Sequence, residues 1–160
     1  MRRLLIELRP GAASSEIRGL IDDFATGEIS GPVAAQQEQI DRWFSHDRME
    51  DILASLQRDG SEAALSTLKA LNEKSPRGMV VTLALLRLAR GASSLEECLV
   101  REYRAALEVL RSDDFREGVR AAVIDKDRSP KWSPSRVEDV TTEMLAPYFA
   151  EIGAEELVFP

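Results

Sequence analysis

The stretch Ser75–Leu88, with the sequence SPRGMVVTLALLRL, decides the fold of this chain. It opens with a serine hydroxyl that can cap a helix, and a proline follows at the first helical position, where a missing N–H does no harm. From Met79 onward the residues are apolar on nearly every face of a helix. Because such a helix needs neighbours all round, we expect it to lie in the middle of a bundle.

Helical spacing of apolar residues continues on both sides of this stretch, and strand alternation is almost absent. Ser94 and Glu97 have the spacing of a capping box, Asp47 and Glu50 predict another capping pair, and Gly60 predicts a helix end. Further helices are expected near residues 14–24, 33–44, 61–71, 113–124 and 141–149. The sequence therefore predicts an all-α bundle of about seven helices, forming a single helical region over residues 1–160.

Composition excludes several classes of partner. The chain has 160 residues, of which 44% are hydrophobic and 31% charged, as is usual for one soluble globular domain. Its 21 basic and 28 acidic residues give a net charge of −7, which argues against a nucleic-acid partner. No apolar run approaches the length of a membrane span, so no membrane partner is expected. A single cysteine fits a reducing compartment, and we expect a cytoplasmic protein.

Nucleophilic and metal chemistry find little support in the sequence. His46 is the only histidine, and we interpret it as a surface loop residue beside a helix entrance. Cys98 falls on the apolar face of its helix and is interpreted as a buried structural thiol. One histidine and one cysteine cannot supply a zinc tetrad. We therefore predict no catalytic residue and no metal site.

Residues 116–136 depart from the acidic background, with six basic residues against three acidic ones. Cations in such a run can bind phosphates through charge-assisted hydrogen bonds, and Trp132 can stack on a base or cap a pocket. The competing interpretation is a solvated charged loop that Trp132 anchors to the core. Gly118 interrupts the preceding helix, at about 1 kcal/mol relative to alanine, and indicates a close approach of another group.

The run Asp114–Trp132, DFREGVRAAVIDKDRSPKW, resembles the C-terminal signature of the 3-hydroxyisobutyryl-CoA hydrolases, a branch of the crotonase (enoyl-CoA hydratase/isomerase) superfamily. Ser75-Pro76, the segment 95–104 and Tyr148-Phe149 are similar to that family's pattern in order and spacing. The resemblance covers essentially the whole chain but only about the C-terminal half of the family. It implies the C-terminal helical region of a crotonase-like hydrolase, without the N-terminal spiral of β-strands and helices.

The resemblance also implies a function. The family hydrolyses a β-hydroxyacyl-CoA thioester in valine degradation, with its catalytic groups in the N-terminal part, so the isolated chain is expected to be inactive. Acyl-CoA is the implied substrate; coenzyme A enters as part of it, and no separate cofactor is expected. The residues that the resemblance places near the nucleotide end of coenzyme A are Lys126 first, then Arg120 and Lys131, with Trp132 as the aromatic partner.

Two alternatives remain beside the hydrolase. The chain can be a non-catalytic helical module that binds a separately encoded crotonase-like core, or a fragment of an enoyl-CoA hydratase/isomerase. A homo-oligomer is a further possible partner arrangement, and acyl specificity stays open. A large exposed apolar surface, on Met79–Leu88 or Val33–Phe44, would indicate that the helices normally pack on a core.

Overall fold

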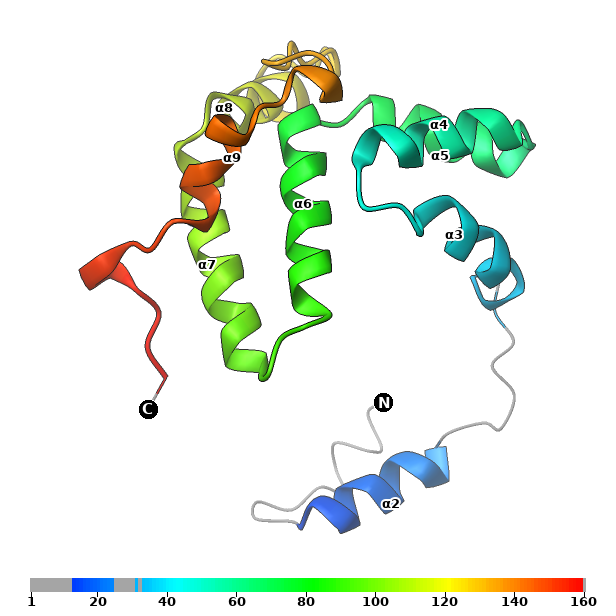
Figure 1. Ribbon diagram of the computed structural model, residues 1–160, viewed down its shortest axis with the longest axis vertical. Coiled ribbons are helices and arrows are strands. Elements are labelled where there is room, and N and C mark those ends of the chain that lie inside the picture. Colours follow the sequence, from blue (N-terminus) through cyan, green and yellow to red (C-terminus); the bar gives the residue numbers. More distant parts are fainter. Residues whose placement is uncertain (1–12, 25–30, 32, 160) are drawn as a thin grey trace. The chain divides into compact units, whose positions relative to one another are not determined.

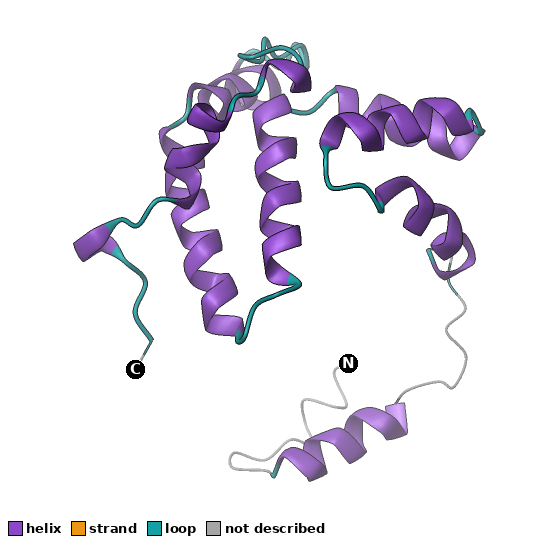
Figure 2. Ribbon diagram, viewed as in Figure 1, coloured by secondary structure: helices purple, strands orange, loops and turns teal. Residues whose placement is uncertain are grey.

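The computed structural model describes residues 13–24, 31 and 33–159. All regular structure in this part of the chain is helical (Figure 2), which confirms the all-α prediction. The α-helices are α2 (Ser14–Phe24), α3 (Gln37–Phe44), α4 (Met49–Asp59), α5 (Glu62–Asn72), α6 (Pro76–Ala89), α7 (Leu95–Arg111), α8 (Asp113–Val119) and α9 (Thr142–Phe149). The shorter elements are the 3-10 turns η1 (Ala34–Gln36), η3 (Val137–Asp139) and η4 (Gly153–Glu155) and the π-helical segment η2 (Arg120–Ile124).

The backbone divides into two compact units, Met1–Asp41 and Arg42–Pro160. The described part of the first unit contains α2, η1 and the start of α3. All residues of the candidate site belong to the second unit. The prediction of a single helical region over residues 1–160 stays a prediction. Within the described ranges, every helix is too short or too polar to cross a bilayer.

Helix α6 lies at the centre of Arg42–Pro160, as its apolar surface predicts. It runs beside α7 and also packs against α4, α9 and η3 (Figure 1). Two buried clusters flank it. The first consists of Trp43, Met49, Ile52, Leu56, Ala64, Met79, Leu83 and Val137. The second consists of Val81, Ala105 and Tyr148.

Most helix ends form where the sequence predicts them. Ser61, Ser75 and Ser94 each accept a hydrogen bond from the backbone N–H three residues on, and so cap α5, α6 and α7. Gly60 ends α4 in the left-handed region, at φ 67°, where glycine has no steric penalty. These ends depend on contacts within a few residues, so local sequence is enough to predict them.

Two predicted caps are wrong. Asp47 does not cap α4; its carboxylate lies 3.1 Å from Nε of Arg87, and Arg48 takes the cap position without a side-chain bond. The second is the cap of the helix expected near residues 113–124, for which the sequence predicts Asp113 or Asp114; α8 is instead capped by Ser112, whose Oγ accepts from the N–H of Phe115 at 3.2 Å. Asp47 is engaged by Arg87 and Asp114 by Ser75, and both partners are distant in sequence. Local sequence patterns do not indicate such partners.

Candidate functional site

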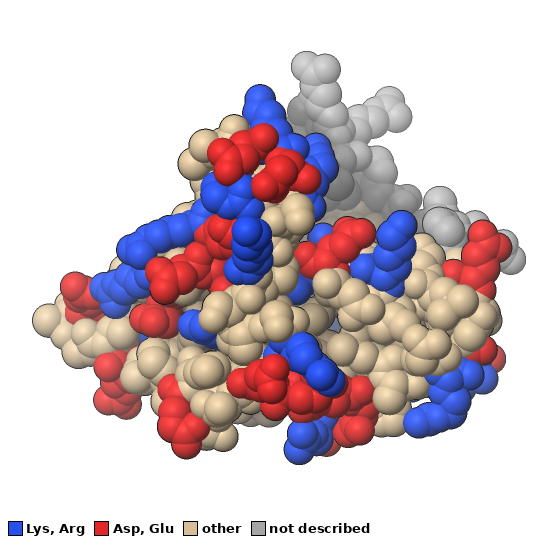
Figure 3. All heavy atoms as spheres, turned by 90° about the horizontal axis from the view of Figure 1, so that it is seen from above, with Lys and Arg blue, Asp and Glu red and all other residues tan. Residues whose placement is uncertain are grey.

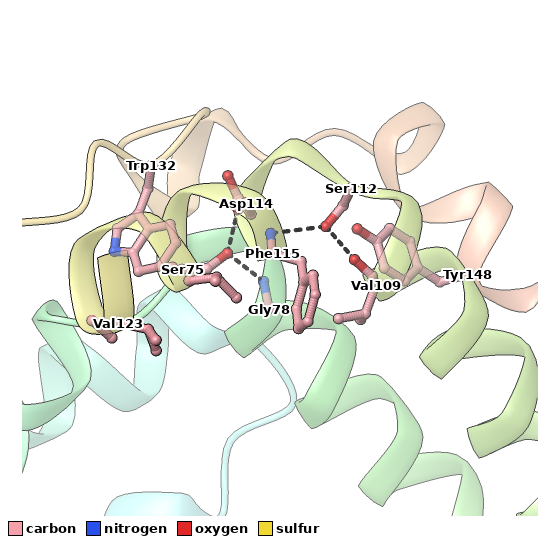
Figure 4. A pocket seen from close by; sticks show the side chains of 12 residues that line it. Ser75, Gly78, Val109, Ser112, Asp114, Phe115, Val123, Trp132 and Tyr148 are labelled. Atoms are coloured by element: carbon pink, nitrogen blue, oxygen red, sulfur yellow. Dashed lines mark hydrogen bonds between the residues drawn. The ribbon is translucent and has the colours of Figure 1, made fainter. Parts of the chain in front are cut away.

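A hydroxyl–carboxylate pair, with the carboxylate buried, joins the first turns of α6 and α8. Ser75 Oγ accepts from the N–H of Gly78 at 3.0 Å and donates to Asp114 Oδ2 (Figure 4). The other carboxylate oxygen of Asp114 accepts from the N–H of Ser133 at 3.2 Å. Asp114 is only 8% exposed, so both oxygens need donors to offset lost hydration. One carboxylate thus holds two helices and the following loop together.

The indole of Trp132 lies against α8 at Gly118. A Cβ at Gly118 would come 3.3 Å from Trp132 Cη2, which is tighter than an ordinary contact. On its other side the indole Nε1 donates to the carbonyl of Glu73 at 3.2 Å, just before α6. The close approach predicted at Gly118 is therefore confirmed, and the partner is the tryptophan itself.

Glu117 and Arg120 fasten the loop that follows η2. They form two parallel hydrogen bonds, from Nε to Oε2 at 2.8 Å and from Nη2 to Oε1 at 2.7 Å. Oε1 of Glu117 also accepts from the N–H of Lys131 at 2.7 Å. Donation by Arg120, and then by Lys131, lowers the pKa of the Glu117 carboxyl to about 2, and the same pairing raises the pKa of Arg120. Glu117 is therefore charged at neutral pH.

An apolar pocket, here called the α6–α8 pocket, opens between these helices. Its volume is about 330 Å³ and its lining is almost wholly apolar. Phe115 and Val123 are 41% and 62% exposed at its surface (Figure 4). The lining residues are Ser75, Gly78, Val109, Ser112, Asp114, Phe115, Gly118, Val119, Ala122, Val123, Trp132 and Tyr148.

A second and more polar pocket, the loop-side pocket, adjoins the first. It has a volume of about 510 Å³ and shares Gly118, Ala122 and Trp132 with the α6–α8 pocket. Its lining contains two cations, Lys74 and Arg128. Acidic and basic side chains lie intermixed over the face shown in Figure 3. A polar, partly cationic pocket beside an apolar one suits a ligand with an anionic part and an apolar part.

Arg120 begins η2, whereas Lys126, Lys131 and Trp132 lie in the loop that follows, and the four predicted binding residues have different environments. Trp132 lines both pockets, Arg120 is bonded to carboxylates, and Lys126 and Lys131 are exposed and absent from both linings. The assignment of all four to coenzyme A stays a prediction.

Lys74 lines the loop-side pocket and was missed by the sequence analysis. It directly precedes the Ser75-Pro76 helix start, and backbone N–H groups at helix starts favour anions; this is the one local signal that could have singled it out.

The residues considered for nucleophilic or metal chemistry lie apart from both pockets. His46 and Cys98 are half-buried, so the thiol of Cys98 is more exposed than the expectation of a buried thiol. His46 contributes only its backbone carbonyl to a described contact, accepting from Nη2 of Arg87. Among the residues described, no group of three or more histidine, cysteine, aspartate or glutamate side chains has the arrangement of a metal site.

The sequence pattern of the enoyl-CoA hydratase/isomerase family matches residues 2–149. Together with the helical fold, this match shows that the chain belongs to the enoyl-CoA hydratase/isomerase family, within the crotonase superfamily. The resemblance seen in the sequence is thereby confirmed.

Among curated proteins, the chain is similar to the mitochondrial 3-hydroxyisobutyryl-CoA hydrolases of Bos taurus and Homo sapiens, each 43% identical over 76% of this chain. It is also 41% identical to a probable 3-hydroxyisobutyryl-CoA hydrolase of Arabidopsis thaliana. The chain spans about a third of the length of these relatives, 31% for the bovine and human proteins and 35% for the plant one.

Two solved structures of the superfamily share the fold. A carnitinyl-CoA dehydratase from Mycobacterium thermoresistibile superposes with a TM-score of 0.77 and 32% identity, covering 91% of this chain and 42% of that one. An enoyl-CoA hydratase from Rhodobacter sphaeroides gives a TM-score of 0.73 and 34% identity, with 89% and 43% coverage. The helical arrangement is therefore common to relatives that are named for different reactions.

Proposed function

We propose that this chain forms the C-terminal helical part of an acyl-CoA thioester hydrolase resembling 3-hydroxyisobutyryl-CoA hydrolase, the enzyme that the family resemblance connects with valine degradation. In this role its helices cover the coenzyme A cleft. The printed names of the curated relatives support the hydrolase class. We expect the catalytic groups and the determinants of acyl specificity to lie in the part of the relatives that this chain does not match. Localisation in the cytoplasm stays a prediction, and the curated animal relatives are named as mitochondrial.

The observation that carries this proposal is the pairing of the two pockets. Coenzyme A joins a diphosphate and a 3′-phosphate to a long, less polar pantetheine arm. The loop-side pocket offers Lys74 and Arg128 to phosphates, with Trp132 available to an adenine face. The adjoining α6–α8 pocket offers apolar contacts to the arm. In this proposal the extended ligand occupies both pockets and passes the residues that they share, Gly118, Ala122 and Trp132.

Calorimetric titration of the chain with coenzyme A tests the proposal. Saturable binding is expected, and Lys126→Ala should weaken it by removing a cation from the loop. Lys69→Ala is the matched control, because Lys69 is an exposed lysine on α5 away from both linings. Adenosine 3′,5′-bisphosphate, which carries the adenine and the 3′-phosphate, should compete with coenzyme A. A folded chain that binds no coenzyme A would overturn the proposal.

Hydrolysis itself is tested with the same preparation. Thiol release from 3-hydroxyisobutyryl-CoA, followed with a thiol reagent, should not exceed the rate in buffer. Turnover at rates typical of enzymes, of about 1 per second or more, would show that the described helices hold catalytic groups after all. Hydration of an enoyl-CoA, measured in parallel, distinguishes the hydratase/isomerase alternative.

A second candidate function rests on exposed apolar side chains. Leu86 and Leu88 on α6 are 60% and 44% exposed, and Val123 and Ile124 are 62% and 69% exposed beside the α6–α8 pocket. A helical module that binds a separately encoded crotonase-like core would leave such residues uncovered. Mixing the chain with the unmatched part of a 3-hydroxyisobutyryl-CoA hydrolase, expressed separately, should then give a stable complex in sedimentation. Leu86→Gln should weaken it.

A further inference from the structure

Every N–H donor of the Arg120 guanidinium is already used within the protein. A guanidinium has five such donors in a fixed planar fork. Beside the two bonds to Glu117, Nη1 donates to Asp125 Oδ2 at 2.6 Å and to Asp127 Oδ2 at 2.7 Å, and Nη2 donates to the carbonyl of Ser129 at 3.2 Å. A phosphate could therefore bind Arg120 only by displacing one of these acceptors.

The same bonds shape the loop between them. Asp125 and Asp127 turn their carboxylates to Arg120, while the residues that alternate with them, Lys126 and Arg128, adopt left-handed backbone conformations with φ of 58° and 52°. For residues other than glycine this conformation is sterically unfavourable. It persists only where surrounding contacts over-determine the backbone. The contacts of Arg120 supply that constraint.

Further bonds hold the ends of this segment. The N–H of Arg128 donates to the carbonyl of Ala121 at 3.0 Å, and the N–H of Ser129 donates to Asp127 Oδ1 at 2.9 Å. Asp127 thus accepts a backbone N–H bond on Oδ1 and a bond from Arg120 on Oδ2. We call Arg120 with Glu117, Asp125 and Asp127 the arginine clamp.

The arginine clamp separates the charges of this loop. Its three carboxylates are paired with Arg120, whereas Lys126 and Arg128 are exposed and take part in none of the ion pairs found among residues 13–24, 31 and 33–159. Arg128 also lines the loop-side pocket together with Lys74. The carboxylates of the sequence Asp-Lys-Asp-Arg are thereby occupied, and the cations stay available to an anion.

We infer that Arg120 is a positioning residue: it does not contact the phosphates of the ligand, but holds Lys126 and Arg128 in the left-handed conformation that presents them as a preformed anion-binding pair. This inference rests on the proposed function, and it gives Arg120 a different role from the direct contact expected from the sequence. A preformed pair avoids the ordering cost that two flexible cations would otherwise bear on binding.

Neutralising the clamp carboxylates gives opposite results under the two roles. In the variant Asp125→Asn/Asp127→Asn, two negative charges leave the neighbourhood of the site, which by electrostatics alone would tighten the binding of coenzyme A or pyrophosphate. If Arg120 positions the loop, binding weakens instead, by about tenfold or more, because Lys126 and Arg128 are no longer held.

The matched control is Asp113→Asn/Glu138→Gln. It removes the same charge from exposed pairs with Arg116 and Arg136 in the same basic run. Its affinity for both ligands should equal or exceed that of the parent chain. A clamp variant that binds as tightly as this control, or more tightly, overturns the inference while the proposed function stands.

Amide hydrogen exchange separates failure of the inference from failure of the proposed function. If the parent chain binds no coenzyme A, the proposed function fails. The loop is then examined directly through the N–H groups of Arg128 and Lys131, which are bonded in the parent. If these N–H groups exchange faster in the clamp variant but not in the control variant, the result supports a positioning role for Arg120. If their exchange in the clamp variant is unchanged, the inference is overturned.

Discussion

At the scale of single residues, Gly118 and Trp132 control how the loop after η2 meets α8. The missing Cβ at Gly118 lets the indole lie directly on the helix, and the indole N–H then reaches the carbonyl of Glu73. Because this indole lines both pockets, a substitution at Gly118 that moves the indole should change the shape of both.

The first prediction concerns Gly118→Leu. The new side chain has no room beside Trp132, and overpacking of this kind costs about 1–3 kcal/mol, which should appear as a lower free energy of unfolding in denaturant titration. Displacement of the indole should also shift tryptophan fluorescence to longer wavelength. Gly19→Leu is the control, since nothing lies within 4 Å of a Cβ there, and it should leave the fluorescence unchanged. An unshifted spectrum for Gly118→Leu would contradict the packing described.

The second prediction concerns the pH dependence of the Glu117 carboxyl. Its folded-state pKa of about 2 lies below the ordinary value of 4.5, so its stabilising contribution is complete above 4.5 and is lost as the pH falls toward about 2. Carbon NMR of the carboxyl should show a midpoint near 2. In Arg120→Gln the midpoint should rise toward 4.5, because the strongest donor is gone. A parent midpoint near 4.5 would show that the pairing with Arg120 is absent in solution.

At the scale of elements, the N-terminus of α6 depends on α8 as well as on its own sequence. Ser75 acts as an ordinary cap through Gly78, yet its hydroxyl proton goes to a buried aspartate on another helix. The loop 129–133 is attached at the same place through Ser133, which also accepts from Arg77 through its carbonyl. The start of α6 is therefore a junction of three segments.

The third prediction compares two caps. Ser94→Ala removes a cap bond in an exposed setting and should cost about 1 kcal/mol. Ser75→Ala removes a cap bond and also leaves an oxygen of buried Asp114 without its donor, which adds about 1–3 kcal/mol. Thermal unfolding of both variants measures the difference. Equal losses would show that the bond between Ser75 and Asp114 contributes nothing to stability.

At the scale of the whole molecule, the net charge of the chain opposes an anionic ligand, whereas one segment has the opposite charge balance. The chain carries a net charge of −7, whereas residues 116–136 hold six basic and three acidic residues. An anionic ligand is thus repelled by the average surface and attracted by Lys126, Arg128 and their neighbours over a short range.

The fourth prediction follows from this contrast. Salt screens exposed charges beyond about 10 Å at 0.1 M and about 3 Å at 1 M, so the dissociation constant for coenzyme A should rise severalfold between these concentrations. The variant Lys126→Ala should show a shallower salt dependence than Lys69→Ala. Affinity that does not change with salt would place the binding energy in the apolar pocket instead.

Much of the fold could be predicted because its signals are local. The apolar surface of Met79–Leu88 predicts a central helix, and the cap residues predict where helices begin, since both depend on neighbours a few residues away. The candidate site was predicted less completely. Composition and helix interruption singled out Trp132 and Gly118, which line both pockets, but Lys74 joins the loop-side pocket from 54 residues before Arg128, a proximity that no spacing rule indicates.

The sequence by itself determined that the described part of the chain is all-helical, that its central helix begins directly after the cap residue Ser75, and that the chain is a member of the enoyl-CoA hydratase/isomerase family. Only the tertiary structure decided what the charges do. In sequence, Arg120 is one of six cations in a basic run; in the fold, its five donors are filled by three carboxylates and a carbonyl. The physical reason is that helix formation depends on short-range bonds, whereas the role of a charge depends on every group that the folded chain brings near it.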